Sequence, residues 1–256
     1  MTQTRVELAT SPDGGQVATV VYDNAAKLNA LNQSQALALA ERIAETARNP
    51  ALRVMVLRGA GERALIGGAD IRQMAETTPD EAEAFITSIH RVCDAVRRVP
   101  VPVVARLAGY CLGAGLEVAA ACDIRIAGED AVLGMPEVQV GLPSVIEAAL
   151  LPRLVGWGRS AYLVYTGETI DAATALDWGL VERVVPNREL DAAVAAVIGA
   201  IARAAPQAVR LQKELCRDWE ELPLRDAVQR GIEIMPRAFA TGEARERMQA
   251  FLARKR

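Results

Sequence analysis

The sequence predicts an α/β fold in which helices cover a largely parallel sheet. Apolar strands alternate with helical patterns over roughly the first 190 residues, which is typical of this class. The chain has 256 residues, of which 51% are hydrophobic and 4% aromatic, so we expect a large aliphatic core. The expected strands are VATVVY (17–22), RVMVLRG (53–59), VPVVARLAG (101–109), CDIRIAG (122–128) and LVERVVP (180–186).

The helical pattern continues almost to the end of the chain beyond Pro186. Breaks are expected at the prolines of this part, which are Pro206, Pro223 and Pro236. We therefore predict an α/β core at 1–190 and a helical C-terminal region at 191–256. Its segment AAVAAVIGAIARAA (192–205) is more apolar than a lone helix needs, which predicts a homo-oligomer.

Composition and charge narrow the possible partners. The net charge of −3 and the pI of about 5.5 argue against a nucleic acid held by a broad basic face. The first residues lack the pattern of a signal peptide, and no apolar run reaches the ~18 residues of a membrane span. We expect a cytoplasmic protein with no membrane partner.

The cysteines and the single histidine restrict the chemistry. The cysteines show no C-x-x-C spacing and are expected to be reduced and buried: Cys93, Cys111, Cys122 and Cys216. A Ser-His-Asp triad or a His-rich zinc site would have to use His90, so no metal site is expected. His90 lies beside the apolar stripe of a helix (77–98), and we expect it to have no catalytic role. That helix begins with an N-cap, a first-turn proline and a capping-box partner, which are Thr78, Pro79 and Glu81.

Two glycine-rich turns each follow a strand and precede a helix. In GYCLGAGLEVAAACD (109–123), the third glycine of a dinucleotide-binding motif is replaced by Val118, and no Walker lysine follows. Backbone N–H groups at such a helix start can instead face a developing negative charge. The second turn, ALIGGADIRQM (64–74), follows RVMVLRG in the same way. Two such turns suggest an oxyanion hole; the alternative is ordinary tight turns that use glycine for positive φ.

Five stretches give the sequence a specific resemblance over essentially its whole length. They are KLNALN (27–32), GGADIRQM (67–74), PVPVVARLAGYCLGAGLEVAAACDIRIAG (100–128), GMPEVQVGLP (134–143) and LVYTGETIDAATALDWGLVERVVP (163–186). The chain resembles the enoyl-CoA hydratase/isomerase superfamily, the crotonase family. The resemblance implies a spiral of β-β-α turns, a C-terminal helical region that forms trimers or dimers of trimers, and a CoA thioester as substrate, with no cofactor.

The resemblance also implies binding residues. Ala69 and Ala114 match the positions whose backbone N–H groups bind the thioester oxygen. The implied CoA-binding residues are Ala26, Lys27, Leu28, Ala69, Asp70, Ile71, Arg72 and Gly113. Phe251 and Arg254 match positions that reach the CoA of a neighbouring subunit.

Glu117 and Glu137 match the two catalytic carboxylates of hydratases. Hydration of an enoyl thioester needs water delivered to Cβ and a proton delivered to Cα, and two carboxylates can divide this work. By resemblance, Glu117 helps to activate the water and Glu137 protonates Cα. Without catalysis, Glu117 would only favour a helix N-terminus and Glu137 would be a solvated loop residue.

One segment departs from the family. Many hydratases have G-x-x-P-G-x-G-G-T-Q after the second glutamate, whereas GLPSVIEAALLPRLVG (141–156) is one residue shorter and almost without glycine. Its bulkier residues are expected to reshape the acyl pocket, as is Ile66, and Glu147 adds a third carboxylate nearby. The leading function is hydration of a 2-enoyl-CoA. The alternatives are double-bond isomerisation or another CoA-enolate reaction, and a catalytically silent trimer that acts as a binding protein.

Overall fold

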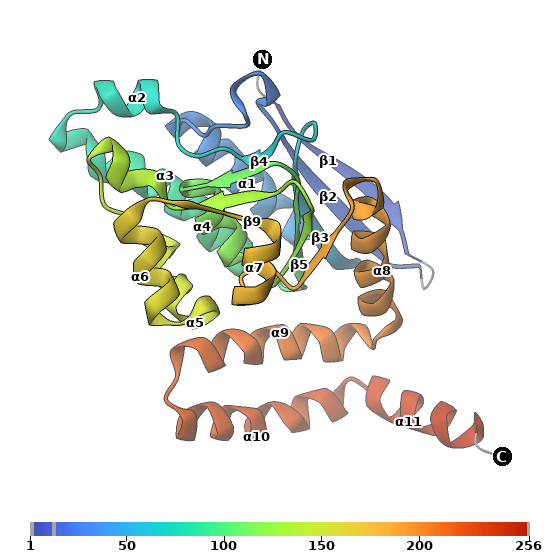
Figure 1. Ribbon diagram of the computed structural model, residues 1–256. Helices are drawn as coiled ribbons and strands as arrows, with labels where there is room; N and C mark the ends of the chain where they lie inside the picture. Colours follow the sequence, from blue (N-terminus) through green and yellow to red (C-terminus); the bar gives the residue numbers. More distant parts are fainter. Residues whose placement is uncertain (1–2, 12–13, 255–256) are drawn as a thin grey trace.

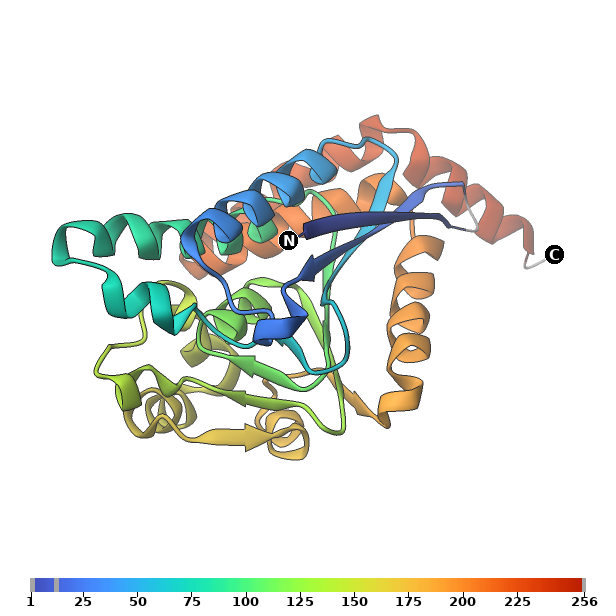
Figure 2. The ribbon, with the colours of Figure 1, turned by 90° about the horizontal axis from the view of Figure 1, so that it is seen from above.

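The computed structural model describes residues 3–11 and 14–254 and arranges the strands in two sheets (Figures 1 and 2). The larger sheet has the order β1-β2-β3-β5-β7-β10 and is parallel except for the β1–β2 pair. Its strands are β1 (Gln3–Thr10), β2 (Gln16–Asp23), β3 (Leu52–Gly59), β5 (Val103–Leu107), β7 (Ile124–Gly128) and β10 (Arg183–Val185). All five strands expected from the sequence are present, and the α/β prediction is confirmed.

The smaller sheet has the order β4-β6-β8-β9. Its strands have three residues each: β4 (Ala64–Ile66), β6 (Tyr110–Leu112), β8 (Val132–Gly134) and β9 (Thr169–Asp171). Three times in succession the chain places one strand in the large sheet and the next in the small sheet, as β3–β4, β5–β6 and β7–β8. This repetition is the spiral of β-β-α turns that the resemblance implied. It also corrects one detail, because β4 lies between β3 and the GGAD turn.

Helices cover both faces of the large sheet. The long helices are α1 (Gln33–Ala47), α3 (Pro79–Arg97), α6 (Trp157–Thr166), α8 (Leu190–Arg203), α9 (Pro206–Glu221), α10 (Leu224–Ala240) and α11 (Glu243–Arg254). The short ones are α2 (Ile71–Glu76), α4 (Ala114–Ala121), α5 (Leu151–Val155) and α7 (Ala172–Trp178), with 3-10 turns η1 (Ala25–Lys27), η2 (Pro136–Val140), η3 (Ile146–Leu150) and η4 (Asn187–Glu189). The start of α3 is as predicted, since the Glu81 carboxylate accepts a hydrogen bond from the Thr78 N–H at 3.0 Å.

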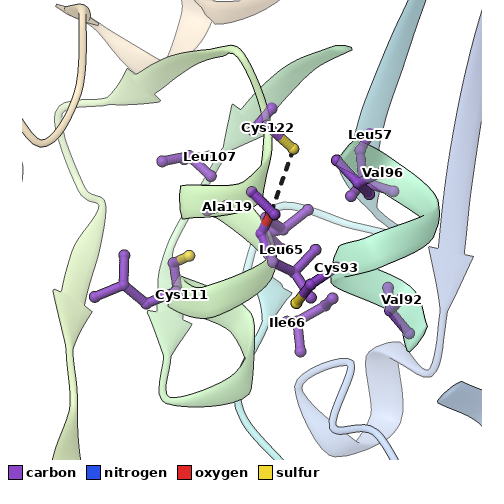
Figure 3. Close-up of a cluster of buried hydrophobic side chains, with 14 of the residues drawn as sticks. Leu57, Leu65, Ile66, Val92, Cys93, Val96, Leu107, Cys111, Ala119 and Cys122 are labelled. Atoms are coloured by element: carbon purple, nitrogen blue, oxygen red, sulfur yellow. Dashed lines mark hydrogen bonds between the residues drawn. The ribbon is translucent and has the colours of Figure 1, made fainter. Parts of the chain in front are cut away.

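The main core lies between the large sheet and α1, α3 and α4. Helix α4 is buried along its whole length, which explains its alanine-rich sequence. Figure 3 shows three cysteines in this core, Cys93 on α3, Cys111 on β6 and Cys122 after α4. They are free and buried as predicted, whereas Cys216 is only half-buried. A smaller core lies on the other face of the sheet, where α8 packs on Val54, Val56 and their neighbours.

The C-terminal helices are attached to the core through Asp123, which precedes β7. Its carboxylate accepts hydrogen bonds from the Val103 N–H at 2.7 Å, from Arg217 at 2.9 Å and from the buried Lys213 of α9. Figure 1 shows α9 and α10 side by side below this body, with α11 leading away from it. Helix α8 packs on the sheet, and α9 bonds to Asp123 before β7 and, through Arg210, to Pro50 O and Leu52 O before β3, so the region after residue 190 is fastened to the core at several places.

The expected helix break at Pro236 is wrong. Pro206 and Pro223 do stand at the starts of α9 and α10, but α10 runs through Pro236 to Ala240. An interior proline removes one backbone hydrogen bond at a cost of about 3 kcal/mol. Pro236 stands in the last turns of α10, where the packing of α10 against α9, through the buried Ile234, keeps the chain helical.

No single helix in the described part of the chain is long and apolar enough to cross a membrane. The segments Asn187–Arg203 and Pro206–Glu221 meet the length and composition test only as a pair bent by 108°.

Candidate active site

A cavity of about 600 Å³ lies where both glycine-rich turns meet. It is bounded by α3, by η2 and by the loop that follows η2. Ala69, Ala114, Glu117 and Glu137 all line it, so the residues predicted from the two turns and the two glutamates come together. Its remaining wall is mostly apolar and includes Met74, Phe85, Ile86, Ile89, Leu142 and Val145. The cavity therefore combines an apolar chamber with a small polar floor, as ligand sites generally do.

The glycines of the turn before α4, Gly113 and Gly115, are required by close contacts. A Cβ on Gly115 would lie 1.9 Å from the Ile66 carbonyl oxygen, so only glycine lets the start of α4 reach the end of β4. Gly113 has φ of 51°, and a Cβ there would lie 2.2 Å from Oε1 of Glu137. These glycines are not explained by turn geometry alone. They allow two backbone segments and one carboxylate to occupy the same small space.

Both alanines line the cavity. Ala114 is the first residue of α4, where an N–H has no acceptor within the helix. Ala69 forms an isolated parallel bridge with Leu31, whose N–H donates to Gly68 O at 2.9 Å and whose O accepts from Asp70 N at 2.7 Å. In such a bridge the bridged residue's own N–H points away from its partner strand. The arrangement can supply two donors to one anionic oxygen.

The two segments expected to hold CoA lie side by side. Gly67 N donates to Leu28 O at 2.8 Å, and Lys27 Nζ lies 3.1 Å from the carboxylate of Asp70. Asp70 also caps α2 by accepting from Arg72 N at 3.0 Å. Burial raises the pKa of Asp70, but the bonds from Lys27 and Arg72 outweigh it, and the net pKa is lowered. Of the remaining predicted residues, Ala26, Ile71 and Arg72 are exposed near this pair of segments, while Gly113 lines the cavity.

Phe251 and Arg254 do not join this site. Both belong to α11, which lies at the opposite end of the molecule from α2 in both views (Figures 1 and 2). The Phe251 side chain is 58% exposed, and the side chain of Arg254 lies outside the described residues. Their contact with the CoA of a neighbouring subunit remains a prediction.

Glu117 is the more buried of the two glutamates. Its side chain projects from the first turn of α4, and the residue is 4% exposed. Its Oε1 accepts a hydrogen bond from the Ala148 N–H at 3.1 Å. Burial, followed by the charge of Glu137, raises the pKa of Glu117 to about 8, and the Ala148 bond only partly opposes this.

Glu137 stands in η2 on the other side of the cavity floor. Burial raises its pKa as well, while the Ser144 hydroxyl, which donates to Oε2 at 2.8 Å, acts in the opposite direction. Between the two pKa values the pair carries a single proton. One carboxyl can then donate a proton while the other accepts one, which is the division of work that general acid–base catalysis needs.

Comparison with known proteins agrees with this geometry. The sequence family described as Enoyl-CoA hydratase/isomerase matches residues 13–256. The chain belongs to this family. A crotonyl-CoA hydratase of Syntrophomonas wolfei is 34% identical over 239 residues, which are 93% of this chain and 92% of the relative. A short-chain-enoyl-CoA hydratase of Clostridium acetobutylicum is 33% identical over 94% and 93% of the two chains. The crystal structure of an enoyl-CoA hydratase from Bacillus anthracis superposes with a TM-score of 0.92, at 31% identity over 98% and 96% of the two chains.

The structure shows where the segment after Glu137, which departs from the pattern of the enoyl-CoA hydratase/isomerase family, lies. Leu142, Pro143 and Val145 form part of the cavity wall, as expected for a reshaped pocket. Ile66, in contrast, is fully buried in the core and does not line the cavity, so its expected effect on the pocket is wrong.

Sequence reasoning missed the donors of the two glutamates. Ser144 is seven residues from Glu137, and Ala148 is 31 residues from Glu117. No motif marks either one. Glu147 was noticed as an additional carboxylate, but its contact with His90 was not anticipated.

Replacement of Ala114 by proline tests the oxyanion hole. Proline is well tolerated at the first position of a helix, so Ala114→Pro removes the N–H with little expected change to α4. Loss of one donor typically costs about 10²–10³ in kcat, and we expect a loss of that size. The measurement is kcat with an enoyl-CoA, alongside a circular dichroism spectrum.

Trp157→Pro provides the matched control. Trp157 is the 80% exposed first residue of α6 and also follows a glycine with positive φ. We expect that variant to retain its kcat. A folded Ala114→Pro variant with the kcat of the unmodified chain would contradict the assignment.

Proposed function

We propose that the chain adds water across the 2,3 double bond of a 2-enoyl-CoA thioester to give a 3-hydroxyacyl-CoA. The observation that carries the proposal is one cavity lined by two carboxyls with raised pKa values, Glu117 and Glu137, together with Ala69 and Ala114, to whose backbone N–H groups we assign the thioester oxygen. An isomerase needs to move one proton between two carbons and can use one such group. Two carboxyls are what hydration requires, because water must lose a proton while Cα gains one. The names of the curated relatives support the same reaction.

The proposed reaction follows from the positions of these groups. The thioester oxygen lies at the N–H groups of Ala69 and Ala114, which stabilise the negative charge that develops when water attacks Cβ. The ionised carboxyl takes a proton from the water, and the protonated carboxyl delivers its proton to Cα. The sum is the addition of one water, and the pair ends with one proton as it began. No redox or metal chemistry enters this balance, and we propose that no cofactor is needed.

The location of the shared proton adds one requirement. Burial and the neighbouring carboxylates raise the pKa of Glu117 to about 8, so we assign the shared proton of the free protein to that residue. The roles taken from the family make Glu117 the base and Glu137 the acid. The proton must therefore pass from Glu117 to Glu137, which a water placed between the two carboxyls can accomplish. We propose that this proton transfer occurs when the thioester binds at the N–H groups of Ala69 and Ala114.

The remainder of the substrate has a matching place. The paired segments around Leu28 and Asp70 stand at one edge of the cavity, and the chamber lined by Phe85, Ile89 and Val145 is apolar. We propose that the CoA portion lies along the paired segments and that the acyl chain enters the chamber.

Removal of either carboxyl's charge tests the reaction. Glu117→Gln and Glu137→Gln keep size and polarity but lose most of the capacity for proton transfer. Each is expected to lower kcat for hydration by roughly 10²-fold or more, the usual scale for general acid–base catalysis. The double variant should lose less than the product of the two, because groups that act as a unit are not additive.

The assay follows the loss of conjugated enoyl absorbance with a panel of 2-enoyl-CoAs of different chain lengths. Glu129→Gln, which removes an exposed carboxylate between β7 and β8, is the control and should change nothing. Retention of normal hydration by folded Glu117→Gln or Glu137→Gln would refute the proposed roles. A panel on which the unmodified chain shows no hydration would refute the function itself.

The pH dependence should be bell-shaped because the reaction needs exactly one proton on the pair. Below the raised pKa of Glu137 both carboxyls are protonated and no base remains. Above about 8, the pKa of Glu117, both are ionised and no acid remains. The pH profile of kcat/KM reports the free protein. We expect kcat/KM to decline on the acidic side at a pH above 4.5, the ordinary value from which the pKa of Glu137 is raised, and to decline on the alkaline side near pH 8. A kcat/KM that stays constant from pH 6 to pH 10 would contradict the shared proton.

We also propose that the functional unit is built on trimers. Helix α10 carries large apolar side chains that are more than half exposed in the single chain and recur at three- and four-residue spacing: Leu224, Val228, Ile232, Met235 and Phe239. A stripe of this kind on a helix is expected to be covered by another surface. A neighbouring subunit would also bring Phe251 to a second CoA, which the single chain does not do.

Sedimentation tests the assembly. The unmodified chain should sediment as a trimer or a multiple of it at micromolar concentration. Ile232→Glu places a charge in the middle of the stripe and should release smaller species, because the charge would have to be buried without a partner. A dilute and fully active monomer of the unmodified chain would refute the trimer.

A further inference from the structure

Glu147 is a third buried carboxylate that the proposed reaction does not use. It lies in η3 and is 8% exposed, yet it does not line the cavity. Burying a carboxylate is costly unless it is paired and hydrogen-bonded. Because Glu147 does not line the cavity, its burial must be explained by the residues around it.

The first neighbour is His90 of α3. Its Nδ1 lies 2.9 Å from Oε1 of Glu147, and the imidazole extends from there to the surface, with 49% of the side chain exposed. An ionised carboxylate can only accept, so Nδ1 carries the proton in this bond. The Cys93 thiol, also on α3, is a second hydrogen-bonding neighbour of the Glu147 carboxylate. Glu147 is thus held from α3 by both His90 and Cys93.

The second connection runs through the backbone to Glu117. The N–H of Ala148, the residue after Glu147, is shared between Val145 O at 2.9 Å and Glu117 Oε1 at 3.1 Å. The residue before Glu147, Ile146, has φ of 36°, a value that a β-branched side chain disfavours. Strain of this kind persists only where surrounding contacts hold it. The bond from His90 holds the side chain of Glu147, and the bond to Glu117 holds the N–H of Ala148. Together these bonds fix the peptide that joins Glu147 to Ala148.

The third connection is electrostatic. Glu137 from η2 and Glu147 from η3 act on the carboxyl of Glu117, and the thiol of Cys93 on α3 lies near Glu117 and Glu147. After burial and the charge of Glu137, the charge of Glu147 is a further cause that raises the pKa of Glu117. Burial is the first cause that raises the pKa of the Cys93 thiol, and the charges of Glu147 and then Glu117 raise it further. Cys93 therefore lies near both carboxylates. The three groups lie in one pocket of low polarity between α3 and α4.

We propose that Glu147 and His90 form a dyad that positions Glu117 and keeps the shared proton on it until the substrate binds. Glu147 is a positioning residue, because it acts through Glu117 and through the Ala148 peptide and does not touch the substrate. His90 holds Glu147 in place from the surface. The sequence analysis expects no catalytic role for His90, and in this proposal His90 is a positioning residue that does not touch the substrate. The inference rests on the proposed hydration.

A purely structural role makes a different prediction. If Glu147 only tied η3 to α3, a glutamine would serve as well, because an amide of the same size can keep a hydrogen bond to His90. The variant would then change stability but not the protonation of Glu117. The charge itself is what the dyad requires, so the test is a pH profile and not an activity at a single pH.

Glu147→Gln is the decisive variant. Removal of its charge removes one cause of the raised pKa of Glu117, so the alkaline limb of kcat/KM should move to lower pH by at least about 0.5 unit. KM at the pH optimum should stay within about twofold, because Glu147 does not line the cavity. Glu129→Gln makes the same change in net charge on an exposed loop and should leave the limb in place. An unmoved limb in folded Glu147→Gln overturns the dyad.

His90→Ala tests the coupling without touching the core. Because His90 is half-exposed, this variant is expected to fold even if Glu147→Gln does not. Without the imidazole donor a buried carboxylate is strongly disfavoured in its charged form. The limb should therefore move in the same direction as in Glu147→Gln, whereas a limb that stays or rises overturns the proposal.

Titration of Glu117 by NMR, with ¹³C-labelled glutamate, separates this inference from the proposed function. It needs no turnover, and the Glu117 signal can be assigned by its loss in Glu117→Gln. A lowered midpoint in Glu147→Gln supports the dyad even in a chain that hydrates no enoyl-CoA. An unchanged midpoint refutes it even in an active hydratase.

Discussion

The site depends on the close approach of two backbone segments, the end of β4 and the start of α4. Gly115 has no side chain, and a Cβ at that position would meet the Ile66 carbonyl at 1.9 Å. With this contact in place, the turn at Ala69 and the turn at Ala114 open into the same cavity, and the first turn of α4 carries Glu117 to its floor. The hydrophobic core behind α4 makes the approach stable, since every residue of that helix is buried. The contact between Gly115 and Ile66 therefore determines both the packing of α4 and the positions of the residues that line the cavity.

The burial that stabilises α4 also determines the acid–base properties of the site. Glu117 is almost fully buried, and Glu137 and Glu147 add like charges from two other elements. The folded chain therefore binds a proton on Glu117 that an unfolded chain releases near the ordinary value of 4.5. Stability falls as the pH rises from that value through about 8, because the unfolded state gives up the proton more readily. The site gains a usable proton at neutral pH and opposes folding in the alkaline range, which is common for functional sites.

The sequence predicted the large elements and the residues that carry a motif, and it failed where a feature is short or non-local. Strands such as β3 are long and apolar because both of their faces are covered, so they stand out. The strands of the small sheet have three residues each, too few to show any period, and the edge strand β1 has no buried residue over 4–10 and is exposed throughout 7–10. Glu117 and Glu137 could be found because each lies in a stretch that carries the family resemblance, LGAGLEV and GMPE. Ser144 and Ala148 could not, since a hydrogen bond to a residue 31 positions away is decided by the path of the chain and not by local pattern.

The segment from Gly141 to Leu150 departs from the family pattern, and it contacts the two glutamates that match that pattern. Leu142, Pro143 and Val145 line the cavity, while Ser144 and the Ala148 N–H bond to the two glutamates. A change in this segment therefore alters the shape of the cavity and the acidity of Glu117 and Glu137 together. The segment has one glycine and a strained Ile146, so it has little freedom to change one without the other. Under the proposed function, selectivity for the acyl group and the protonation of Glu117 are coupled through this stretch of backbone, which contacts α3 through His90.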